Sequence, residues 1–530
     1  MTHHGGQFIN GHWVRSGSVT FDAVNPATGE KIGSSFAQAT AEEIEAALAA
    51  AVTAHIQMRE LEPEHVATFI EAVASELMAL GDEWLQVASA ESGLSIKPRL
   101  EGERARTCGQ LNLFASVVRE GSWREARIDT ALPNRQPLPR PDLRMSLEAL
   151  GPVVIFDASN FPLGFGACGN DMASAIAAGC PVIIKSHTLH PGTNELAARA
   201  VATAMEKTKF PKGAFSLLQG SGREVGASLV KHPKTAAVGF TGSESGGRAL
   251  FDLASARPLP IPVYAEMGSL NPLIIMPGAT NTRSEVLAKG LAQSLLLGAG
   301  QFCTKPGLIF LLETEATDAF IKSLTQEVSA ANSLTLLGKT MQDALSKVTQ
   351  SMEAVSGVSK LISGKPSGYA GHSACLYMVE SSVWKSQSNL HCEAFGPAGV
   401  IVRVKNLSDL LECLQCIPGT LTATLHHGEG DHANDLKNIV ASLSIRAGRV
   451  IFNGFPTGVE VSHAMMHGGP YPATTQSLFT SVGTQAIKRF ARPVCYQNIP
   501  ERFLPPTLHN ANLLKVMRLV NGEYTRDAIS

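Results

Sequence analysis

Residues 151–242 alternate between short apolar runs and longer amphipathic runs, and no other feature of the sequence restricts the possible folds as strongly. The apolar runs read GPVVIFDA, CPVIIK, FSLLQG and TAAVGFTG, and the segments between them have helical spacing of apolar residues. Strands without a polar face occur where helices cover both faces of a parallel sheet. The alternation therefore predicts a doubly wound α/β domain, and a second alternating region extends from about Tyr264 to Gly454.

Length and charge narrow the class of protein. The chain of 530 residues exceeds what one hydrophobic core normally organises, so we expect two or three structural units. It carries 44 Lys and Arg residues against 46 Asp and Glu residues, which leaves no basic excess to attract nucleic acid or anionic lipid. We therefore expect neither a nucleic-acid partner nor a membrane partner.

The N-terminal sequence MTHHGGQFINGHW bears on the location of the protein. It lacks the charged start and the apolar stretch of a signal peptide. No apolar run reaches the roughly 18 residues that a bilayer-spanning helix needs. We expect a cytoplasmic location, where the nine cysteines would be free thiols and not a disulfide framework.

Three local signals predict individual elements. Asn10-Gly11, between apolar and aromatic residues, predicts a tight hairpin. Thr40, followed by an acidic turn and an alanine-rich run, predicts a capped helix. Prolines within residues 128–144 exclude a helix interior and favour an extended arm.

Two glycine-rich turns could bind phosphate. GSGREVG (220–226) and FTGSESGG (240–247) each follow a predicted strand and open a predicted helix. Free backbone N–H groups and the helix dipole favour an anion at such a position, and Gly242 and Ser243 are the candidates for a pyrophosphate contact. The spacing in the first turn differs from the usual dinucleotide fingerprint, so both could also be ordinary turns between strand and helix.

Asn160 and Glu266 stand where catalysis could use them. Asn160 ends a predicted strand, and its amide could donate to an oxyanion without adding charge, although it could also form a turn before Phe161. Glu266 lies among apolar and small residues in AEMGSLNP, where burial would raise its pKa and suit it to act as a base. A structural capping role is the alternative for Glu266.

Cys303 lies in the segment GAGQFCTKPGLIF, between a helix-like run and a strand-like run. The break at Gly298 and Gly300 predicts that the thiol projects from a constrained turn and not from a helix face. A thiolate is a strong nucleophile and leaves readily from a thioester, so covalent catalysis is one interpretation. Inert packing is the other, because cysteine is often buried in apolar surroundings.

The remaining cysteines and histidines do not predict a metal site. Cys413 and Cys416 form a Cys-x-x-Cys pair, but the leucines around them indicate a buried helix face, and no second pair of ligands accompanies them. His391, Cys392 and the His426-His427 pair also lack ligand spacing. We expect no metal ion.

Several motifs together resemble a known family. In this order, SNFP, VIIKS, FTGS, AEMGSLNP, GQFC and EAFGP resemble the aldehyde dehydrogenase superfamily over nearly the whole chain. GSLNP, RPDLR, AAGCPVIIKSHTLHPGT and NGFPTGVEVSHAMMHGGPYPATT look most like the bacterial branch that oxidises α-ketoglutarate semialdehyde (2,5-dioxopentanoate), with NADP-dependent fatty-aldehyde dehydrogenases as close neighbours. The resemblance implies an α/β fold with a Rossmann-type parallel-sheet cofactor domain, an α/β catalytic domain and a β oligomerisation arm.

The resemblance also implies roles for the residues whose motifs match. Cys303 matches the nucleophile, Glu266 the general base, and Asn160 the side chain that holds the oxyanion together with the Cys303 backbone N–H. The implied reaction passes through a cysteine thiohemiacetal and a thioester, which water then hydrolyses to the acid. The matching cofactor residues are Lys185 at the adenosine ribose with Ser186 beside it, Gly242 and Ser243 at the pyrophosphate, and Glu393 and Phe395 at the nicotinamide ribose and ring.

Charge near the ribose lysine predicts the cofactor. NAD-preferring relatives commonly carry a carboxylate three residues after that lysine, whereas this chain has Thr188 there. Arg223, in the following turn, could pair with a 2′-phosphate, to which a guanidinium is well suited. We therefore expect NADP⁺ to be preferred, with NAD⁺ also possible.

Substrate recognition is less sharply defined by the sequence. A substrate with a terminal carboxylate needs a cation near the tunnel mouth. The candidate contacts are Arg104, Arg106 and the neighbouring Phe161. The alternative for both arginines is that they are exposed to solvent or form salt bridges. Lys305 stands where the branch more usually has an asparagine. It could depress the pKa of the thiol or alter the pocket.

The resemblance leads to an assignment of domains, with alternatives for the function. We assign residues 1–127 and 150–262 to a dinucleotide-binding domain, 263–472 to the catalytic domain, 128–149 and 473–503 to the arm, and 504–530 to a C-terminal tail. Pairing of arms between subunits would give a homodimer or homotetramer. The alternatives are a fatty or medium-chain aldehyde dehydrogenase and a catalytically silent ligand-binding member. A CoA-acylating enzyme is disfavoured, because transfer to CoA needs no water-activating base and Glu266 is present.

Overall fold

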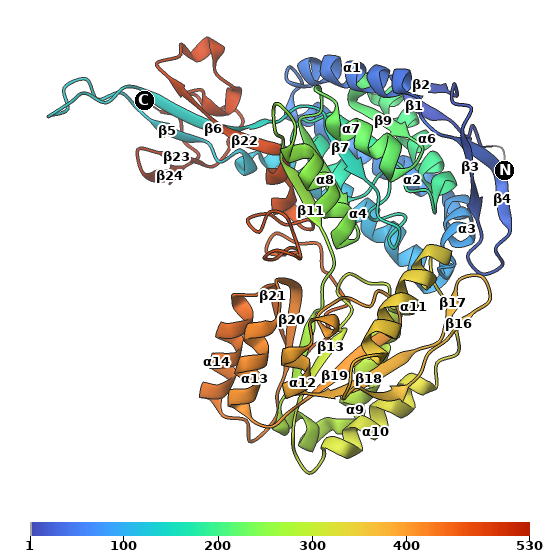
Figure 1. Cartoon of the computed structure of the whole chain (residues 1–530). Helices are drawn as coiled ribbons and strands as arrows, with labels where there is room; N and C mark the ends of the chain where they lie inside the picture. Colours follow the sequence, from blue (N-terminus) through green and yellow to red (C-terminus); the bar gives the residue numbers. More distant parts are fainter. Residues whose placement is uncertain (1–2, 530) are drawn as a thin grey trace.

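The structure is a computed structural model that describes residues 3–529 (Figure 1). Parallel strands form the centre of its first large sheet. The sheet has seven strands in the order β11-β10-β7-β8-β9-β1-β2, and the five strands from β11 to β9 are parallel. The alternation in the sequence correctly predicted this α/β unit. The strands are β1 (Gln7–Ile9), β2 (His12–Val14), β7 (Val153–Phe156), β8 (Val182–Lys185), β9 (Phe215–Leu218), β10 (Ala237–Thr241) and β11 (Val263–Glu266).

Helices cover both faces of this sheet, which explains why its central strands are almost uniformly apolar. Val153 and Ile155 pack into one core cluster, together with residues of α2 to α6. Val154 and Phe156 point to the opposite face and join a second cluster, with residues of α1, α7 and α8. The helices are α1 (Ala41–Met58), α2 (Pro63–Ala79), α3 (Gly81–Ser92), α4 (Glu101–Glu120), α5 (Asn170–Ala177), α6 (Pro191–Thr208), α7 (Ala227–Lys231) and α8 (Glu244–Ser255).

Two local predictions in this unit are confirmed. Asn10 and Gly11 have φ angles of 48° and 82° and connect the antiparallel pair β1 and β2. The Thr40 side chain accepts a hydrogen bond from the Glu43 N–H at 3.2 Å, and Glu43 accepts one from the Thr40 N–H at 2.9 Å. This reciprocal pair is a capping box, and it fixes the start of α1.

The second large sheet follows in the chain and also has seven strands, in the order β15-β18-β19-β13-β12-β20-β21. All of its pairs are parallel except β15 with β18. The strands are β12 (Pro272–Ile275), β13 (Leu308–Leu312), β15 (Ser359–Ile362), β18 (Cys375–Glu380), β19 (Ala398–Val404), β20 (Thr420–His426) and β21 (Ala447–Phe452). The helices are α9 (Pro277–Leu296), α10 (Thr317–Ser329), α11 (Lys339–Glu353), α12 (Ser381–Ser386), α13 (Leu407–Cys416) and α14 (Ala433–Ser444).

Two small sheets complete these units. Strands β3 (Thr20–Val24) and β4 (Lys31–Ala37) form an antiparallel pair beside the N-terminus. Strands β14 (Leu334–Thr335), β16 (Pro366–Ser367) and β17 (Gly371–His372) form the other. Within the described residues, no helix is long and apolar enough to cross a membrane.

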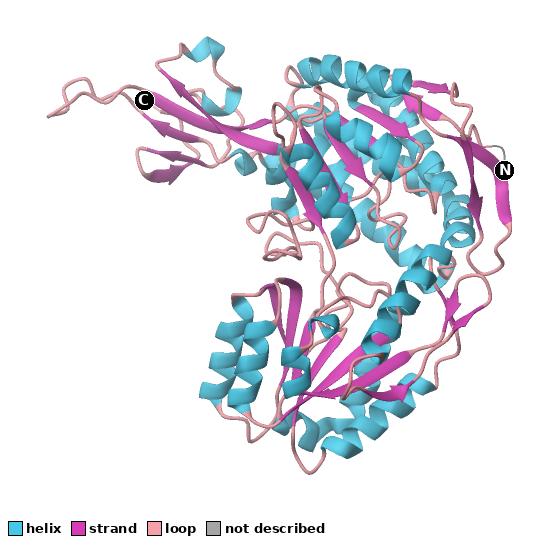
Figure 2. Ribbon diagram, in the orientation of Figure 1, coloured by secondary structure: helices cyan, strands magenta, loops and turns pink. Residues whose placement is uncertain are grey.

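A five-stranded arm projects from the first unit, and Figure 2 shows that it consists mostly of strands and loops. Its strand order is β22-β6-β5-β23-β24, so the residues that we set apart as a tail, 504–530, contribute two strands to the arm sheet. The strands are β5 (Arg127–Asp129), β6 (Leu143–Ala149), β22 (Ala491–Gln497), β23 (Arg518–Val520) and β24 (Glu523–Thr525). The predicted extended character of residues 128–144 is confirmed.

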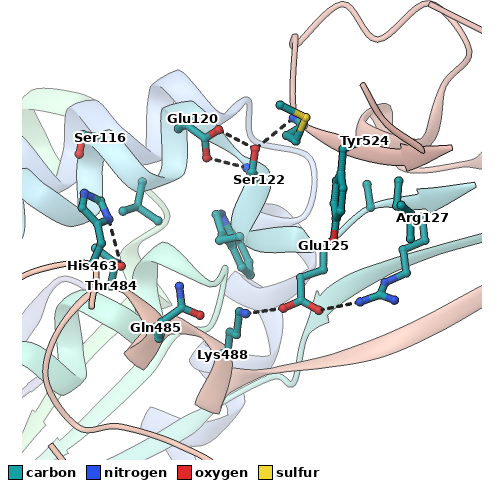
Figure 3. A pocket seen from close by; sticks show the side chains of 15 residues that line it. Ser116, Glu120, Ser122, Glu125, Arg127, His463, Thr484, Gln485, Lys488 and Tyr524 are labelled. Atoms are coloured by element: carbon teal, nitrogen blue, oxygen red, sulfur yellow. Dashed lines mark hydrogen bonds and ion pairs between the residues drawn. The ribbon is translucent and has the colours of Figure 1, made fainter. Parts of the chain in front are cut away.

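A cavity of about 710 Å³ lies where the arm joins the first unit (Figure 3). It is bounded by the end of α4, by β5 and by the chain around Tyr524 in β24. None of its lining residues belongs to the cluster around Cys303, which lies in the loops between the two large sheets.

Candidate active site

Cys303 lies in a tight loop between α9 and β13. Gly298, Ala299 and Gly300 after the helix have φ angles of 58°, 59° and 69°, so the predicted break at the glycines is confirmed. A Cβ atom on Gly300 would lie 2.2 Å from the Gly396 carbonyl oxygen, which leaves room only for glycine. The loop that carries the thiol is therefore packed directly against the loop of Gly396.

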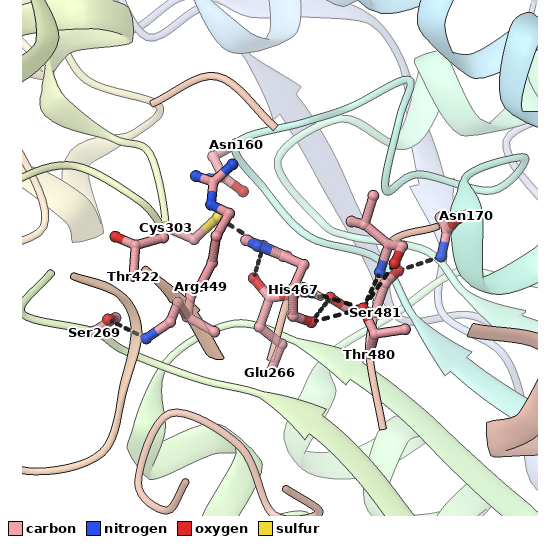
Figure 4. Close-up of polar contacts among 12 residues, drawn as sticks. Asn160, Asn170, Glu266, Ser269, Cys303, Thr422, Arg449, His467, Thr480 and Ser481 are labelled. Carbon is pink, nitrogen blue, oxygen red and sulfur yellow. Dashed lines mark hydrogen bonds and ion pairs between the residues drawn. The ribbon is translucent and has the colours of Figure 1, made fainter. Parts of the chain in front are cut away.

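The thiol contacts a histidine and a glutamate (Figure 4). Cys303 Sγ lies 3.4 Å from His467 Nε2, and the same nitrogen lies 2.9 Å from Glu266 Oε1. Ser481 donates from its hydroxyl to the other oxygen of the Glu266 carboxylate. Glu266 ends β11 in the first sheet, whereas Cys303 precedes β13 in the second, so the cluster joins the two units. Nucleophile, histidine and carboxylate are thus within reach of proton transfer.

The pKa of Glu266 departs from the sequence-based expectation. Burial by itself would raise the pKa of this carboxyl group, as we expected. The charge of His467 and hydrogen bonds from His467, Ser481 and Cys303 outweigh burial, so the pKa of Glu266 is lowered instead. The expectation was wrong because it counted the apolar neighbours in the sequence and not the partners brought in by the fold. Glu266 is therefore an ionised carboxylate at neutral pH.

The pKa of the Cys303 thiol is raised well above its ordinary value of 9.0. Burial is the largest cause, and the negative charges of Glu266 and Glu393 add to it, whereas the Arg106 cation acts in the opposite direction. The resting thiol is therefore protonated, and an adjacent base is needed to generate the thiolate. The Glu266 carboxylate, which accepts a hydrogen bond from the thiol, is such a base, and His467 Nε2 lies 3.4 Å from the sulfur.

Asn160 and Asn271 bind the backbone around Cys303. Asn160 lies in the loop after β7 and donates from Nδ2 to the Gln301 carbonyl at 2.9 Å. Asn271, with a φ angle of 47°, donates to the carbonyls of Cys303 at 2.7 Å and Lys305 at 3.0 Å. Its own side-chain oxygen accepts from the Thr422 hydroxyl in the second sheet at 2.9 Å. The predicted oxyanion amide therefore lies beside the nucleophile, and Asn271 holds the loop that carries the nucleophile.

The predicted ribose lysine lies at the end of a central strand. Lys185 is buried at the end of β8, where burial lowers its pKa to about 8 and the charge of Asp157 opposes that change. Ser186, which follows, accepts from the Asn194 side chain at 3.0 Å. Thr188 is half-buried and Arg223 is exposed. Of these positions, only Lys185 and Arg223 carry a side-chain positive charge.

The predicted pyrophosphate turn opens a helix. Ser243 caps α8 by accepting from the Gly246 N–H at 3.2 Å, and Gly242 is bound through its N–H to the Glu266 carbonyl at 3.0 Å. Both residues are exposed at the positive end of the helix dipole, which suits an anion.

Glu393 and Phe395 are half-buried in the loop before β19. Burial raises the pKa of Glu393 to about 7, although the charge of Lys305 opposes it. A Cβ atom on Gly268 would lie 2.8 Å from the Glu393 carboxylate, so the loop after β11 approaches this carboxylate closely. Glu393 therefore lies on the border between the two units.

Lys305 faces this same loop and not the thiol. Its ammonium group donates to the carbonyls of Ala394 at 2.5 Å, Gly396 at 3.2 Å and Ala398 at 2.8 Å. The largest influences on the pKa of the Cys303 thiol are burial and the charges of other groups. The sequence left open whether Lys305 depresses the pKa of the thiol or alters the pocket. These contacts favour an effect on the pocket.

Arg104 and Arg106 lie on α4, and their surroundings differ. Arg104 donates to the Gly81 carbonyl at 2.8 Å, at the start of α3. The guanidinium carbon of Arg106 is 5.9 Å from the centre of the Phe161 ring, and its Nε is buried without a hydrogen-bond partner among the described residues. Burial lowers the pKa of Arg106, and the negative charges of Cys303 and Glu266 oppose that change. Arg106 is therefore the arginine of this pair that belongs to the cluster.

Arg99 adds a second guanidinium at the same ring. Its carbon lies 4.3 Å from the centre of the Phe161 ring and 5.2 Å from that of Phe302. It also donates to the Asn160 carbonyl at 3.0 Å. The structure thus brings Cys303, Glu266, Asn160, Phe161 and Arg106 together and leaves Arg104 aside.

Sequence reasoning missed several residues of the cluster. His467 lies 164 positions after Cys303 and Ser481 lies 215 positions after Glu266, so no local spacing connects them. Arg449 of β21 is also near the thiol: burial lowers its pKa, and the charge of Cys303 opposes that change. The only available signal for His467 was its place in the HGGPYP part of a motif that the resemblance had already marked.

Comparison with known families identifies the chain. The model of the family described as "Aldehyde dehydrogenase family" matches residues 13–471. The chain belongs to the aldehyde dehydrogenase family. Aldehyde dehydrogenases oxidise aldehydes, so the expected enzyme class is confirmed.

Two relatives are similar to this aldehyde dehydrogenase over its whole length. It is 44% identical over 525 residues to alpha-ketoglutaric semialdehyde dehydrogenase 2 of Azospirillum brasilense, covering 98% of this chain and 99% of the relative. It is also 44% identical over 531 residues to the alpha-ketoglutaric semialdehyde dehydrogenase of Acinetobacter baylyi, covering 99% of each chain. The resemblance to that branch is confirmed.

Solved structures confirm the fold of this aldehyde dehydrogenase. Lactaldehyde dehydrogenase from Escherichia coli superposes with a TM-score of 0.79 at 22% identity, covering 93% of this chain and 98% of the other. An aldehyde dehydrogenase from Bacillus cereus, solved as its NAD⁺ complex, has a TM-score of 0.78 at 21% identity, covering 93% and 96%. The predicted combination of a Rossmann-type sheet and an α/β catalytic domain is correct.

Proposed function

We propose that this aldehyde dehydrogenase oxidises 2,5-dioxopentanoate (α-ketoglutarate semialdehyde) to 2-oxoglutarate through a thiohemiacetal and a thioester on Cys303. The substrate is inferred from the two full-length relatives of that name. The observation that carries the mechanism is the contact of Cys303 Sγ and Glu266 Oε1 with one nitrogen of His467.

Attack on the aldehyde begins with the thiol proton. The Glu266 carboxylate, which accepts a hydrogen bond from the thiol, takes that proton and passes it to solvent, while His467 Nε2 donates to the same carboxylate at 2.9 Å. The thiolate attacks the aldehyde carbon, and negative charge develops on the carbonyl oxygen. The Asn160 amide and the Cys303 backbone N–H hold this oxyanion, so Asn160 exchanges the Gln301 carbonyl for the substrate.

Oxidation leaves a thioester, which the same cluster hydrolyses. When bound, the nicotinamide ring of NADP⁺ supplies the acceptor for the hydride that leaves as the alkoxide collapses. Glu266 then removes a proton from water as the water oxygen attacks the thioester carbon, and the carbon–sulfur bond breaks. The thiolate recovers the proton that Glu266 took from water. Aldehyde, NADP⁺ and water thus give carboxylate, NADPH and two protons.

The residues present fit a dinucleotide with a 2′-phosphate. Lys185, with Ser186 and Thr188 after it, would hold the adenosine ribose, and the absence of a carboxylate at Thr188 leaves room for phosphate charge. Arg223, exposed in the turn after the neighbouring strand β9, would pair with that phosphate. The exposed helix start at Gly242 and Ser243 suits the pyrophosphate, and Glu393 and Phe395 would hold the nicotinamide ribose and ring. NADP⁺ is the preferred cofactor in this proposal, and NAD⁺ is a weaker one.

One arginine favours a substrate that carries a carboxylate, because its neighbour Arg99 is already paired with Glu103. Arg99 and Arg106 both lie against the Phe161 ring, beside the loop that carries Asn160. The unpartnered Nε of Arg106 can still donate to an anion. We assign Arg106 to the distal carboxylate of the substrate, with Phe161 as the wall of the tunnel.

The arms are proposed to join subunits into a homodimer or homotetramer. Exposed apolar side chains on the arm support this, because they would be covered in such an assembly: Leu138 is 70% exposed and Phe503 is 65% exposed. The domain assignment changes at two places: Val263–Glu266 (β11) move to the dinucleotide-binding domain, whose sheet they join, and residues 504–530 move from a separate tail to the arm because β23 and β24 join its sheet.

A panel of aldehydes measured with both cofactors tests the proposal. We expect the highest kcat/KM with 2,5-dioxopentanoate and NADP⁺, and no NADPH formation by the Cys303→Ala variant. The Arg223→Ala variant should lose most of its preference for NADP⁺. Higher kcat/KM on fatty or medium-chain aldehydes would overturn the substrate assignment, and binding of NADPH without oxidation of any aldehyde would indicate a silent member of the family.

A further inference from the structure

Lys305 is a buried lysine whose hydrogen bonds all go to one short loop. Its exposed fraction is 1%, and its ammonium group has three N–H donors and no acceptor. Three backbone carbonyls, those of Ala394, Gly396 and Ala398, accept from it within 3.2 Å. The donor capacity of the ammonium group is therefore used by residues 394–398.

The same loop carries the residues proposed for the nicotinamide side of the cofactor. Glu393 directly precedes the first of the three carbonyls, and Phe395 lies between the first and the second. Glu393 and Cys375 are the titratable groups whose charges act on Lys305, and the Glu393 carboxylate attracts the ammonium group. Lys305 thus binds the backbone of the loop and balances the charge of its glutamate.

The other end of Lys305 is attached to the thiol loop. Its carbonyl accepts from the Asn271 side chain at 3.0 Å, and its N–H donates to the Phe302 carbonyl at 3.0 Å. Gly300 approaches the Gly396 carbonyl so closely that no side chain fits between them. The nucleophile and the nicotinamide-side loop are therefore held together by this lysine as well as by backbone packing.

We propose that Lys305 is a positioning residue that fixes the 393–398 loop relative to Cys303 and so sets how tightly the nicotinamide half of the cofactor is held. This proposal rests on the proposed cofactor roles of Glu393 and Phe395. A neutral side chain without donors at position 305 would leave three buried carbonyls without their partner and the Glu393 charge without its counterion. An asparagine is too short to reach all three carbonyls.

Nucleotide binding and nucleotide-free ester hydrolysis separate this role from a role at the thiol. For Lys305→Met we expect the Kd for NADPH, followed by its fluorescence, and the KM for NADP⁺ each to rise about tenfold or more, since charged hydrogen bonds are lost. Hydrolysis of p-nitrophenyl acetate by Cys303 without nucleotide should change less than threefold. Lys305→Gln, which keeps two donors, should lie between wild type and Lys305→Met. Lys322→Met, an exposed lysine on α10, is the control and should match wild type.

The outcomes distinguish this proposal from the proposed function. An unchanged Kd for NADPH in Lys305→Met, or a parallel loss of ester hydrolysis, would overturn the positioning role. Near-UV circular dichroism shows whether Lys305→Met folds, and if it does not, the same comparison is made with Lys305→Gln. An unchanged Kd for NADPH in Lys305→Gln would then overturn the positioning role. A wild-type protein that binds NADPH but oxidises no aldehyde would refute the proposed function, and the NADPH comparison would still test Lys305.

Discussion

The proton on Cys303 determines how the resting thiol reacts. Because its pKa lies well above 9.0, only a small fraction is thiolate at neutral pH. The rate of inactivation by iodoacetamide without nucleotide should therefore rise roughly tenfold per pH unit between pH 7 and 9. A rate that is already constant above pH 7 would mean that the thiolate is present at rest.

The two arginines on α4 offer a matched comparison. The charge of Arg106 lowers the pKa of the Cys303 thiol, so Arg106→Gln should raise that pKa and slow alkylation at pH 8. The same variant should raise the KM for 2,5-dioxopentanoate more than that for an uncharged aldehyde. Arg104→Gln is the control, because Arg104 binds the Gly81 carbonyl. Equal effects of the two variants would contradict the assignment of Arg106.

His467 is expected to affect both the rate and its pH dependence. His467→Ala removes the hydrogen bond that holds the Glu266 carboxylate beside the thiol, so kcat/KM should fall roughly tenfold or more. His467 also helps to lower the pKa of Glu266, so its loss allows burial to raise that pKa. The activity that remains should then decline as pH falls, at a higher pH than in wild type. A pH profile of kcat that keeps its shape would argue against the link between the two residues.

The sequence was sufficient to propose which residues gather around Cys303 but not to predict the electrostatics around it. Cys303, Glu266 and Asn160 could be predicted because each lies in a short motif of its own. His467 could not, because its contact with the thiol depends on folding across 164 positions. The same long-range partner reverses the pKa direction expected for Glu266. Lys305 was noticed as unusual, but its three carbonyl partners were not visible in the sequence.

At the scale of elements, the start of α1 is a clear test of a local signal. Thr40→Ala removes the side-chain acceptor of the capping box, and we expect the free energy of unfolding to fall by about 1 kcal/mol. Hydrogen exchange at the first turn of α1 should become faster. Thr53→Ala, in the exposed middle of the same helix, is the control and should leave that turn unchanged. If hydrogen exchange at the first turn of α1 is no faster in Thr40→Ala than in Thr53→Ala, packing alone fixes the start of the helix.

The elements that were predicted correctly are those whose pattern is local. Strands β7 to β10 follow from four apolar runs, and the helices between them follow from their periodicity. Sheet order was harder, because β1 joins β9 through the contact of Phe8 with Leu217, far apart in the chain. The strands β23 and β24 were missed for a similar reason: each has only three residues, and their pairing with β5 is not local.

At the scale of the molecule, the C-terminal strands are expected to be needed for the arm. Arg518 of β23 is fully buried, and its guanidinium donates to the carbonyls of Asn510 at 3.3 Å and Asp527 at 2.9 Å. Removal of residues 516–530 should expose the edge of β5 and change the oligomeric state, measured by light scattering after gel filtration. NADPH binding should persist, because the first sheet contains none of these residues. An unchanged oligomer would contradict the proposed role of the arm.

The arm sheet also imposes an order on biosynthesis. All strands of the cofactor sheet have been made once Glu266 leaves the ribosome, so that sheet can form during translation. Strand β5 can pair with β6 early, but its other edge must wait much longer for β23: Thr130 just after β5 binds Asn521, which is 391 positions later. Nascent chains on one messenger therefore carry an unfinished arm, and the association proposed for the arm would begin only after nearly the whole polypeptide has been made.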